Sequence, residues 1–272
     1  MQESGKNANI RSVVGDLKEG WKVVKVLENL KELYKGEDVL NKHLCIGCIS
    51  GITALLTDQE FIQSLVAQHN FLLMLAVLVV ALAGCLYLFG YTIETVHYRL
   101  QAGITVLPEI TTQPFKRIIG MSVIMLVWAG YTLIFGGVVL AFAFLVAAIK
   151  ALAFIIVLLY ALFIMFTSYV FIAYSKNFQA AGLMNIALPF KFMKEGFVDT
   201  IILTLKFTVL CIVLTIPLVV IFMLLGVISK TFGLGLAICV GGYFSFIIQL
   251  LWYNCLADIY EEKLQDEVEE LY

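Results

Sequence analysis

The sequence predicts an all-α fold: a polytopic helical membrane bundle of about six transmembrane helices with an N-terminal amphipathic helix. The first supporting observation is composition, because 61% of the 272 residues are hydrophobic and only 14% are charged. Soluble domains carry about 25% charged residues, so this deficit indicates a lipid environment. The second is the apolar stretch Ile118–Tyr174, whose only formally charged residue is Lys150. Since about 20 apolar residues cross a bilayer as a helix, this stretch is long enough for two spans.

The N-terminal region, residues 1–39, is predicted to be a cytosolic amphipathic helix region. Apolar residues recur at helical spacing between positions 8 and 35, and lysines and glutamates fill the opposite face. Such a helix lies along the membrane surface or covers the cytosolic end of the bundle. A coiled-coil dimer is the alternative interpretation, although Gly20 and Lys31 on the apolar stripe count against it.

The short apolar run His43–Leu56 is interpreted through the charges around it, because alone it falls below the usual spanning length. If this run crosses the membrane, one side collects the lysine and arginine excess that marks cytosolic loops. The other side then holds only Lys150 and Lys230. We therefore expect a cell-membrane protein with six spans and with both termini in the cytosol. The approximate spans are 40–57, 70–94, 118–145, 150–174, 198–228 and 232–256.

The predicted domain organisation is a transmembrane domain at 40–256 between the N-terminal region and an acidic cytosolic tail at 257–272. The first 43 residues are charged and lack the apolar core of a secretory signal peptide. In the tail, acidic residues far outnumber the single lysine, Lys263, and apolar residues keep helical spacing. We expect the last span to continue into a short amphipathic helix.

A weak internal repeat occupies the two longer inner loops. If it is real, the fold contains helical hairpins repeated in one orientation about an axis along the membrane normal. Chance similarity is the competing interpretation, because the alignment requires gaps. The first copy is Gln101, Gly103, Leu107-Pro108, Phe115-Lys116 and Gly120, and the second is Gln179, Gly182, Leu188-Pro189, Phe190-Lys191 and Gly196.

Residues 90–131 resemble a known family. Gly90-Tyr91 ends one span, Gly103 and Leu107-Pro108-Glu109 lie in the following loop, and Gly120 opens the next span. This pattern is similar to that of the domain-of-unknown-function 4013 family of prokaryotic multi-pass membrane proteins. The resemblance covers the second half of the chain only loosely. It implies a six-span helical fold, and it implies no activity.

Three residues are candidate polar intramembrane residues: Glu94, His97 and Lys206. Glu94 and His97, with Tyr98, share one helix face, and a carboxylate beside histidine inside a membrane can relay protons. The neighbouring Arg99 favours an ordinary helix end that meets water. Lys206 either binds an anionic group or pairs with Asp199, or its long stem simply reaches the membrane surface.

No catalytic, cofactor-binding or metal-binding residue is predicted. The sequence His43-x-Cys45-x-x-Cys48 offers too few ligands for a closed zinc site, and no second cluster supplies the rest. The six cysteines suggest no disulfide framework. Nucleic acid is not an expected partner, because no basic patch interleaved with aromatic residues is present.

A ridge of small residues is the candidate helix-packing site of the last span. Its members recur every four residues, and small residues allow close approach between membrane helices. Packing within the bundle and a homo-oligomer interface remain two interpretations of this ridge. The residues are Gly233, Ala237, Gly241 and Ser245.

The function predicted from these observations is that of a non-enzymatic multi-pass membrane protein, a scaffold or accessory subunit. Nearly all charge lies at the predicted cytosolic face, which is therefore the expected docking surface for a protein partner. The alternative is a transporter or lipid-binding protein with a membrane-depth cavity near Glu94 and Lys206. An intramembrane enzyme is the least favoured class, because no histidine lies deep in a span. Membrane lipid is the one partner that every interpretation includes.

Overall fold

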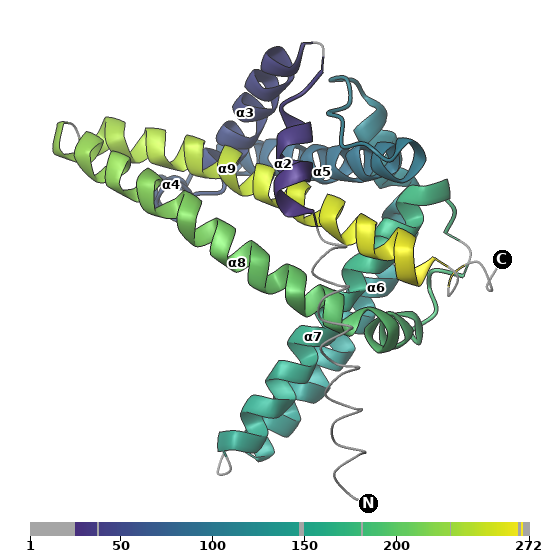
Figure 1. Cartoon of the computed structure of the whole chain (residues 1–272). Coiled ribbons are helices and arrows are strands. Elements are labelled where there is room, and N and C mark those ends of the chain that lie inside the picture. Colours follow the sequence, from purple (N-terminus) through teal and green to yellow (C-terminus); the bar gives the residue numbers. More distant parts are fainter. Residues whose placement is uncertain are drawn as a thin grey trace, which may run out of the picture. The chain divides into compact units, whose positions relative to one another are not determined.

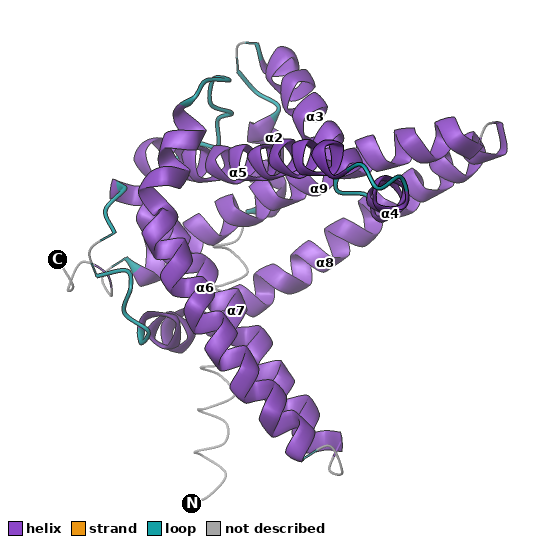
Figure 2. Cartoon of the chain, turned by 180° about the vertical axis from the view of Figure 1, so that it is seen from behind, coloured by secondary structure: helices purple, strands orange, loops and turns teal. Residues whose placement is uncertain are grey.

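Every regular element in the part of the chain that the structure describes is a helix. The computed structural model describes residues 25–36, 38–146, 150–180, 182–228, 230–265 and 268. Figure 2 shows helices joined by loops, with no strand among these residues. The elements are α2 (Val26–Leu33), α3 (Val39–Leu56), α4 (Gln59–Ala67), α5 (Phe71–Ala102), α6 (Gln113–Leu145), α7 (Lys150–Asn177), α8 (Leu188–Ile228), α9 (Lys230–Ile259) and the π-helical turn η1 (Tyr260–Leu264).

Six helices are long and apolar enough to cross a membrane: α3, α5, α6, α7, α8 and α9. Large apolar side chains cover their outer surfaces, with Leu72, Phe144 and Val227 all more than four-fifths exposed. A soluble protein rarely exposes apolar patches of this extent, whereas lipid tails solvate them. The predicted all-α, six-helix class is confirmed, and the protein is a multi-pass helical membrane protein.

The chain divides into two compact units. The α3 unit comprises Lys25–Ile118 and Leu203–Cys255, and therefore contains α2 to α5, the start of α6, and most of α8 and α9. The α7 unit contains Ile119–Ile202 and the described residues from Leu256 onward.

Glycines bring α3 against two other helices of the α3 unit. Gly84 of α5 faces Thr53 so closely that a Cβ atom there would overlap the threonine hydroxyl. Gly242 of α9 lies over α3, where an added Cβ would stand 2.5 Å from the Cβ of Ala54 and 2.9 Å from the carbonyl oxygen of Ser50. Membrane helices gain stability mainly from such close packing, because lipid provides little hydrophobic driving force between them.

A second close approach joins α8 and α9 near their connection (Figure 1). An added Cβ at Gly233 would lie 2.9 Å from the backbone nitrogen of Gly226. The two glycines allow this close approach where α8 ends and α9 begins, and the two ribbons diverge further from the connection in Figure 1.

In the α7 unit, α6 and α7 form an antiparallel pair (Figure 1). The Tyr160 hydroxyl donates to the carbonyl oxygen of Thr132 at 2.9 Å, and it also packs on Gly136. The Trp128 indole N–H donates to the Leu183 carbonyl at 2.9 Å, so the loop after α7 is held against α6. Hydrogen bonds from a tyrosine and a tryptophan side chain thus hold α6 and α7 together and hold the loop after α7 against α6.

The predicted continuation of the last span is confirmed as far as Leu264. The chain passes from α9 into η1, whose Tyr260 and Leu264 are buried. Leu264 packs on Gly196 at the start of α8, and Lys263 forms an ion pair with Asp199, with 2.7 Å between Nζ and Oδ2. Asp199 therefore pairs with Lys263 of the tail. The rest of the acidic tail, apart from Gln265 and Val268, lies outside the described residues.

Five helices, α5 to α9, are longer than their predicted spans, and α5, α6 and α8 extend furthest at one end. α5 continues past residue 94 to Ala102, α6 begins at Gln113, and α8 begins at Leu188. The prediction rests on apolar length, but helices continue beyond lipid wherever their polar ends remain helix-compatible. Proline stands second in α6 and in α8, as Pro114 and Pro189, where its missing N–H costs nothing.

The helix starts also change the register of the internal repeat. The predicted alignment pairs Pro108 with Pro189, yet Pro108 lies in a loop and Pro189 in a first helical turn. The structural counterpart of Pro189 is Pro114, and each is followed by Phe-Lys. The loop glycines of both copies, Gly103 and Gly182, adopt positive φ angles of 68° and 75°. Only glycine adopts this backbone conformation without strain, so the two loops share a conformational requirement.

Candidate functional site

The candidate site lies in the α3 unit, around the loop between α5 and α6. Its central feature is an ion pair between Glu94 of α5 and Arg117 of α6. The guanidinium Nε lies 2.6 Å from Oε2, and Nη2 lies 3.5 Å from Oε1. The Glu94 side chain is only 8% exposed. A carboxylate buried to this degree requires a charged partner, and arginine satisfies both of its oxygens with a planar fork.

The loop folds back over this ion pair because three contacts hold it. Gly103 ends α5 in the left-handed conformation and donates to the Arg99 carbonyl at 2.9 Å. The buried Tyr91 hydroxyl donates to the Pro108 carbonyl at 2.7 Å. Gly90 of α5 touches the backbone of Pro114, so no side chain larger than hydrogen fits there. Together these contacts bring Pro108 and the start of α6 against the end of α5.

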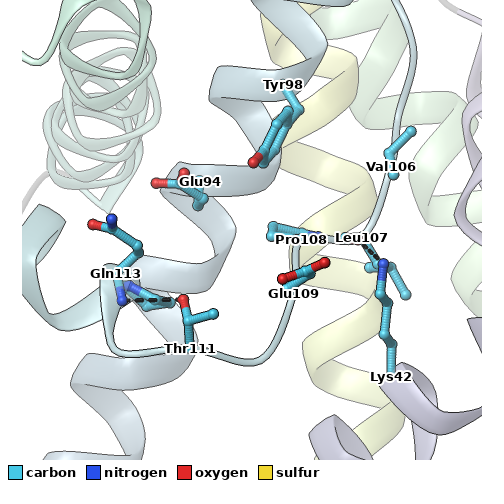
Figure 3. Close-up of a pocket in the computed structure, with 10 residues that line it drawn as sticks. Lys42, Glu94, Tyr98, Val106, Leu107, Pro108, Glu109, Thr111 and Gln113 are labelled. Carbon is cyan, nitrogen blue, oxygen red and sulfur yellow. Dashed lines mark hydrogen bonds between the residues drawn. The ribbon is translucent and has the colours of Figure 1, made fainter. Parts of the chain in front are cut away.

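A cavity of about 350 Å³ lies beside this loop (Figure 3). It opens between the start of α3, the end of α5 and the start of α6, and the Lys42 ammonium crosses to the loop and donates to the Leu107 carbonyl at 3.0 Å. Apolar loop residues complete its wall. Its polar lining residues are Lys42, Glu94, Tyr98, Glu109, Thr111 and Gln113.

Helix α2 is attached to the outer side of the same loop. The Glu32 carboxylate accepts from Arg99 Nη1 at 3.1 Å and from the Thr105 backbone N–H at 2.9 Å. The side chain of Asn29 is buried. Its Oδ1 accepts from the Thr105 hydroxyl at 3.3 Å, and its Nδ2 donates to the Cys255 sulfur at 3.4 Å. These charge-assisted and buried hydrogen bonds hold α2 in place, because a helix this short is not stable in isolation.

His43 connects α2, α3 and α9. Its Nε2 lies 3.0 Å from the Leu33 carbonyl oxygen, and its Nδ1 lies 2.7 Å from the Tyr243 hydroxyl. Because a carbonyl only accepts, neutral His43 carries its proton on Nε2, and Nδ1 accepts from Tyr243. The Tyr34 ring stacks on the imidazole with a centroid distance of 4.4 Å. The buried histidine is therefore a structural junction.

The structure separates the three predicted polar intramembrane residues. Glu94 lines the cavity and pairs with Arg117. His97 is half-buried and packs edge-on against the Tyr98 ring, and Lys206 is half-buried in α8. Neither His97 nor Lys206 lines the described cavity. Glu94 is thus the member of the set that belongs to the candidate site.

The histidine–cysteine motif does not converge. Cys45 and Cys48 are exposed, whereas His43 is buried and hydrogen-bonded on both ring nitrogens. Among the residues described, no group of three or more histidine, cysteine, aspartate or glutamate side chains has the geometry to hold a metal ion.

The small-residue ridge of α9 is only partly used within the chain. Gly233 packs on Gly226, but an added Cβ at Gly241 would meet nothing within 4 Å, and Ser245 is exposed. Ala237 is half-buried. α9 instead packs tightly on α3 at the neighbouring Gly242, which the four-residue period does not include.

Sequence reasoning misses Lys42, Glu109 and Arg117 as site residues. In the sequence, Lys42 and Arg117 stand out only as charges that set orientation, and Glu109 only as part of a loop pattern. Arg117 stands 23 positions after Glu94, on the other side of a predicted loop. Two opposite charges at the two ends of a loop between spans are the signal that could have found it.

Comparison with known proteins identifies no relative: no family model, no curated protein and no solved structure matches this chain. The resemblance to the domain-of-unknown-function 4013 family therefore stays a prediction from the residues around Gly90, and the site has to be interpreted from its own geometry.

Proposed function

We propose that the protein is a non-enzymatic scaffold or accessory subunit of the cell membrane, with α2 as the docking element of its cytosolic face. The observation that carries the proposal is the division of α2 into two faces. Asn29, Glu32 and Leu33 form the inner face and are all bonded to other parts of the α3 unit. The helix is thereby preorganised, which lowers the entropy lost when a partner binds.

The outer face of α2 has the composition of an interaction surface. Leu27 is 63% exposed, and Lys31, one turn further along α2, is also exposed. Residues at i and i+4 lie on one face of a helix. Tyr34, the residue after α2, is 52% exposed although its ring stacks on His43. A leucine anchor beside a lysine suits a partner segment that offers an apolar pocket beside an acidic side chain. The excess of lysine and arginine on one side of the predicted spans supports a cytosolic position for this face and for both termini.

Photocrosslinking of the full-length protein in its own cells tests this proposal. A photoreactive amino acid at Leu27 is expected to yield a discrete protein adduct. The same group at Leu78, an exposed position within the α5 span, is expected to yield only lipid adducts. Lys31→Glu should abolish the Leu27 adduct without changing thermal stability, since Lys31 is exposed. Lipid adducts alone at Leu27 would refute docking and indicate that α2 lies on the membrane.

A further inference from the structure

The cavity beside the α5–α6 loop is of a size that binds small molecules. Its volume of about 350 Å³ falls near the lower end of the about 300–1,000 Å³ typical of ligand sites. Three separate segments form it: the start of α3, the end of α5 and the loop leading into α6. The close contact of Gly90 with Pro114 and the hydrogen bond from Tyr91 to Pro108 keep the cavity formed without a ligand.

The charges of the cavity lining do not neutralise one another. Glu94 is already paired with Arg117. Lys42 uses one N–H to reach the Leu107 carbonyl, and its ammonium has further donors to offer. Within the described residues, the Glu109 carboxylate has no hydrogen bond or ion pair, and none joins it to Lys42. The cavity thus presents one cation and one carboxylate, both available to a ligand (Figure 3).

The cavity also lies where a lipid headgroup would be found. It is bounded by the ends of α3, α5 and α6, all of which are long and apolar enough to span. Tyr98, which lines the cavity, is exposed, and so are Ile110 and Phe115, which adjoin lining residues in the chain. Aromatic and aliphatic side chains at a span end lie at the membrane interface, beside lipid glycerol and upper acyl chains.

We propose that this cavity binds the phosphoethanolamine headgroup of an aminophospholipid. Lys42 binds the phosphate, assisted by the Thr111 hydroxyl, which accepts from the Gln113 backbone N–H at 3.2 Å and keeps its own proton to donate. Glu109 accepts from the ligand ammonium, and the Tyr98 oxygen offers a second acceptor. A primary ammonium donates hydrogen bonds that a trimethylated ammonium lacks, so ethanolamine is preferred over choline lipid. This site involves none of the outer residues of α2.

Native mass spectrometry of the full-length protein in detergent, titrated with defined lipids, tests the proposal. The probes are dioleoyl phosphatidylethanolamine, its N-methylated series up to phosphatidylcholine, and phosphatidylglycerol. We expect one retained lipid, bound about tenfold more tightly as the ethanolamine than as the choline form, the size of one charge-assisted hydrogen bond. Affinity should fall stepwise with each added methyl group. Equal affinity across the series would overturn the proposal.

Matched variants locate the site. Glu109→Gln should abolish the ethanolamine preference, and because Glu109 is exposed and bonded to nothing described, the fold should be unchanged. Lys42→Met should weaken all phospholipids about tenfold. The controls Glu28→Gln and Lys31→Met, both exposed on α2, should bind as the parent does. An unchanged preference in Glu109→Gln would overturn the assignment. If millimolar soluble phosphoethanolamine displaces the lipid, the assignment of the ligand as a lipid is overturned and a water-soluble ligand is identified in its place.

Discussion

Glu94 and Arg117 meet across the α5–α6 loop with 2.6 Å between Oε2 and Nε, although 23 positions separate them in the chain. The pair joins the end of one span to the start of the next. It also neutralises the buried carboxylate that lines the cavity. A loop anchored from both sides in this way forms a fixed wall, which a headgroup site and a docking face both require.

Removing only one member of this pair should be more harmful than removing both. Arg117→Met leaves Glu94 buried beside an apolar group, and we expect a loss of about 2–3 kcal/mol, below the about 3–5 kcal/mol of fully buried pairs, because Arg117 is 27% exposed. The double variant with Glu94→Gln should recover most of this loss. Unfolding in mixed micelles of increasing SDS fraction measures the cycle. Additive effects of the two substitutions would show that the pair contributes little.

The junction at His43 predicts that substituting His43 destabilises the protein more than substituting its partner Tyr243. Tyr243→Phe removes one donor, and we expect a loss of about 1 kcal/mol. His43→Leu leaves both the Leu33 carbonyl and the Tyr243 hydroxyl without the partner shown in the structure, so we expect about 2–3 kcal/mol. Hydrogen exchange should accelerate in α2 for His43→Leu and hardly change for Tyr243→Phe. Equal protection of α2 in both variants would contradict a junction at His43.

The adjacent glycines of α9 provide a matched test of helix packing. Gly242→Ala places a Cβ 2.5 Å from that of Ala54 and should destabilise the protein by about 1–3 kcal/mol. Gly241→Ala meets no atom and should be neutral or stabilising by up to about 1 kcal/mol, because alanine is the better helix former. Thermal unfolding in detergent measures both.

Gly241 also distinguishes the two interpretations of the small-residue ridge. If Gly241 and the exposed Ser245 form a homo-oligomer interface, Gly241→Leu should shift the mass measured by light scattering towards the monomer. An unchanged mass would restrict the ridge to packing within the chain, where Gly233 contacts Gly226.

The ion pair between Asp199 and Lys263 predicts that the tail is held to α8 by charge. Asp199 is 1% exposed, so Lys263→Met leaves a buried carboxylate without its closest cation. We expect proteolysis to begin at residues 260–265 in this variant and to be suppressed again by adding Asp199→Asn. Lys194→Met, which alters an exposed pair with Glu195, is the control and should leave cleavage unchanged.

Part of the candidate site can be predicted from the amino-acid sequence. Glu94 stands out because a carboxylate near the end of an apolar run is costly, and the loop residues Gly103 and Pro108 stand out as backbone punctuation. Lys42 and Glu109 do not, because a charged residue at a helix end or in a loop is ordinary in a membrane protein. Lys42 and Glu109 become site residues only because the start of α3, the end of α5 and the α5–α6 loop meet in the fold. No local sequence pattern encodes where three separate segments meet.

The sequence by itself determined that this is a multi-pass helical protein with six spans, because apolar length and the absence of charge are local properties that lipid selects directly. Tertiary structure alone decided which faces of those helices meet. In a helix that is apolar all round, the lipid-facing and the packed sides have the same hydropathy, so no periodicity marks the interface. Gly242 and not Gly241 packs on α3, Asp199 meets Lys263, and Glu94 meets Arg117 because packing fixed the rotation of each helix about its axis.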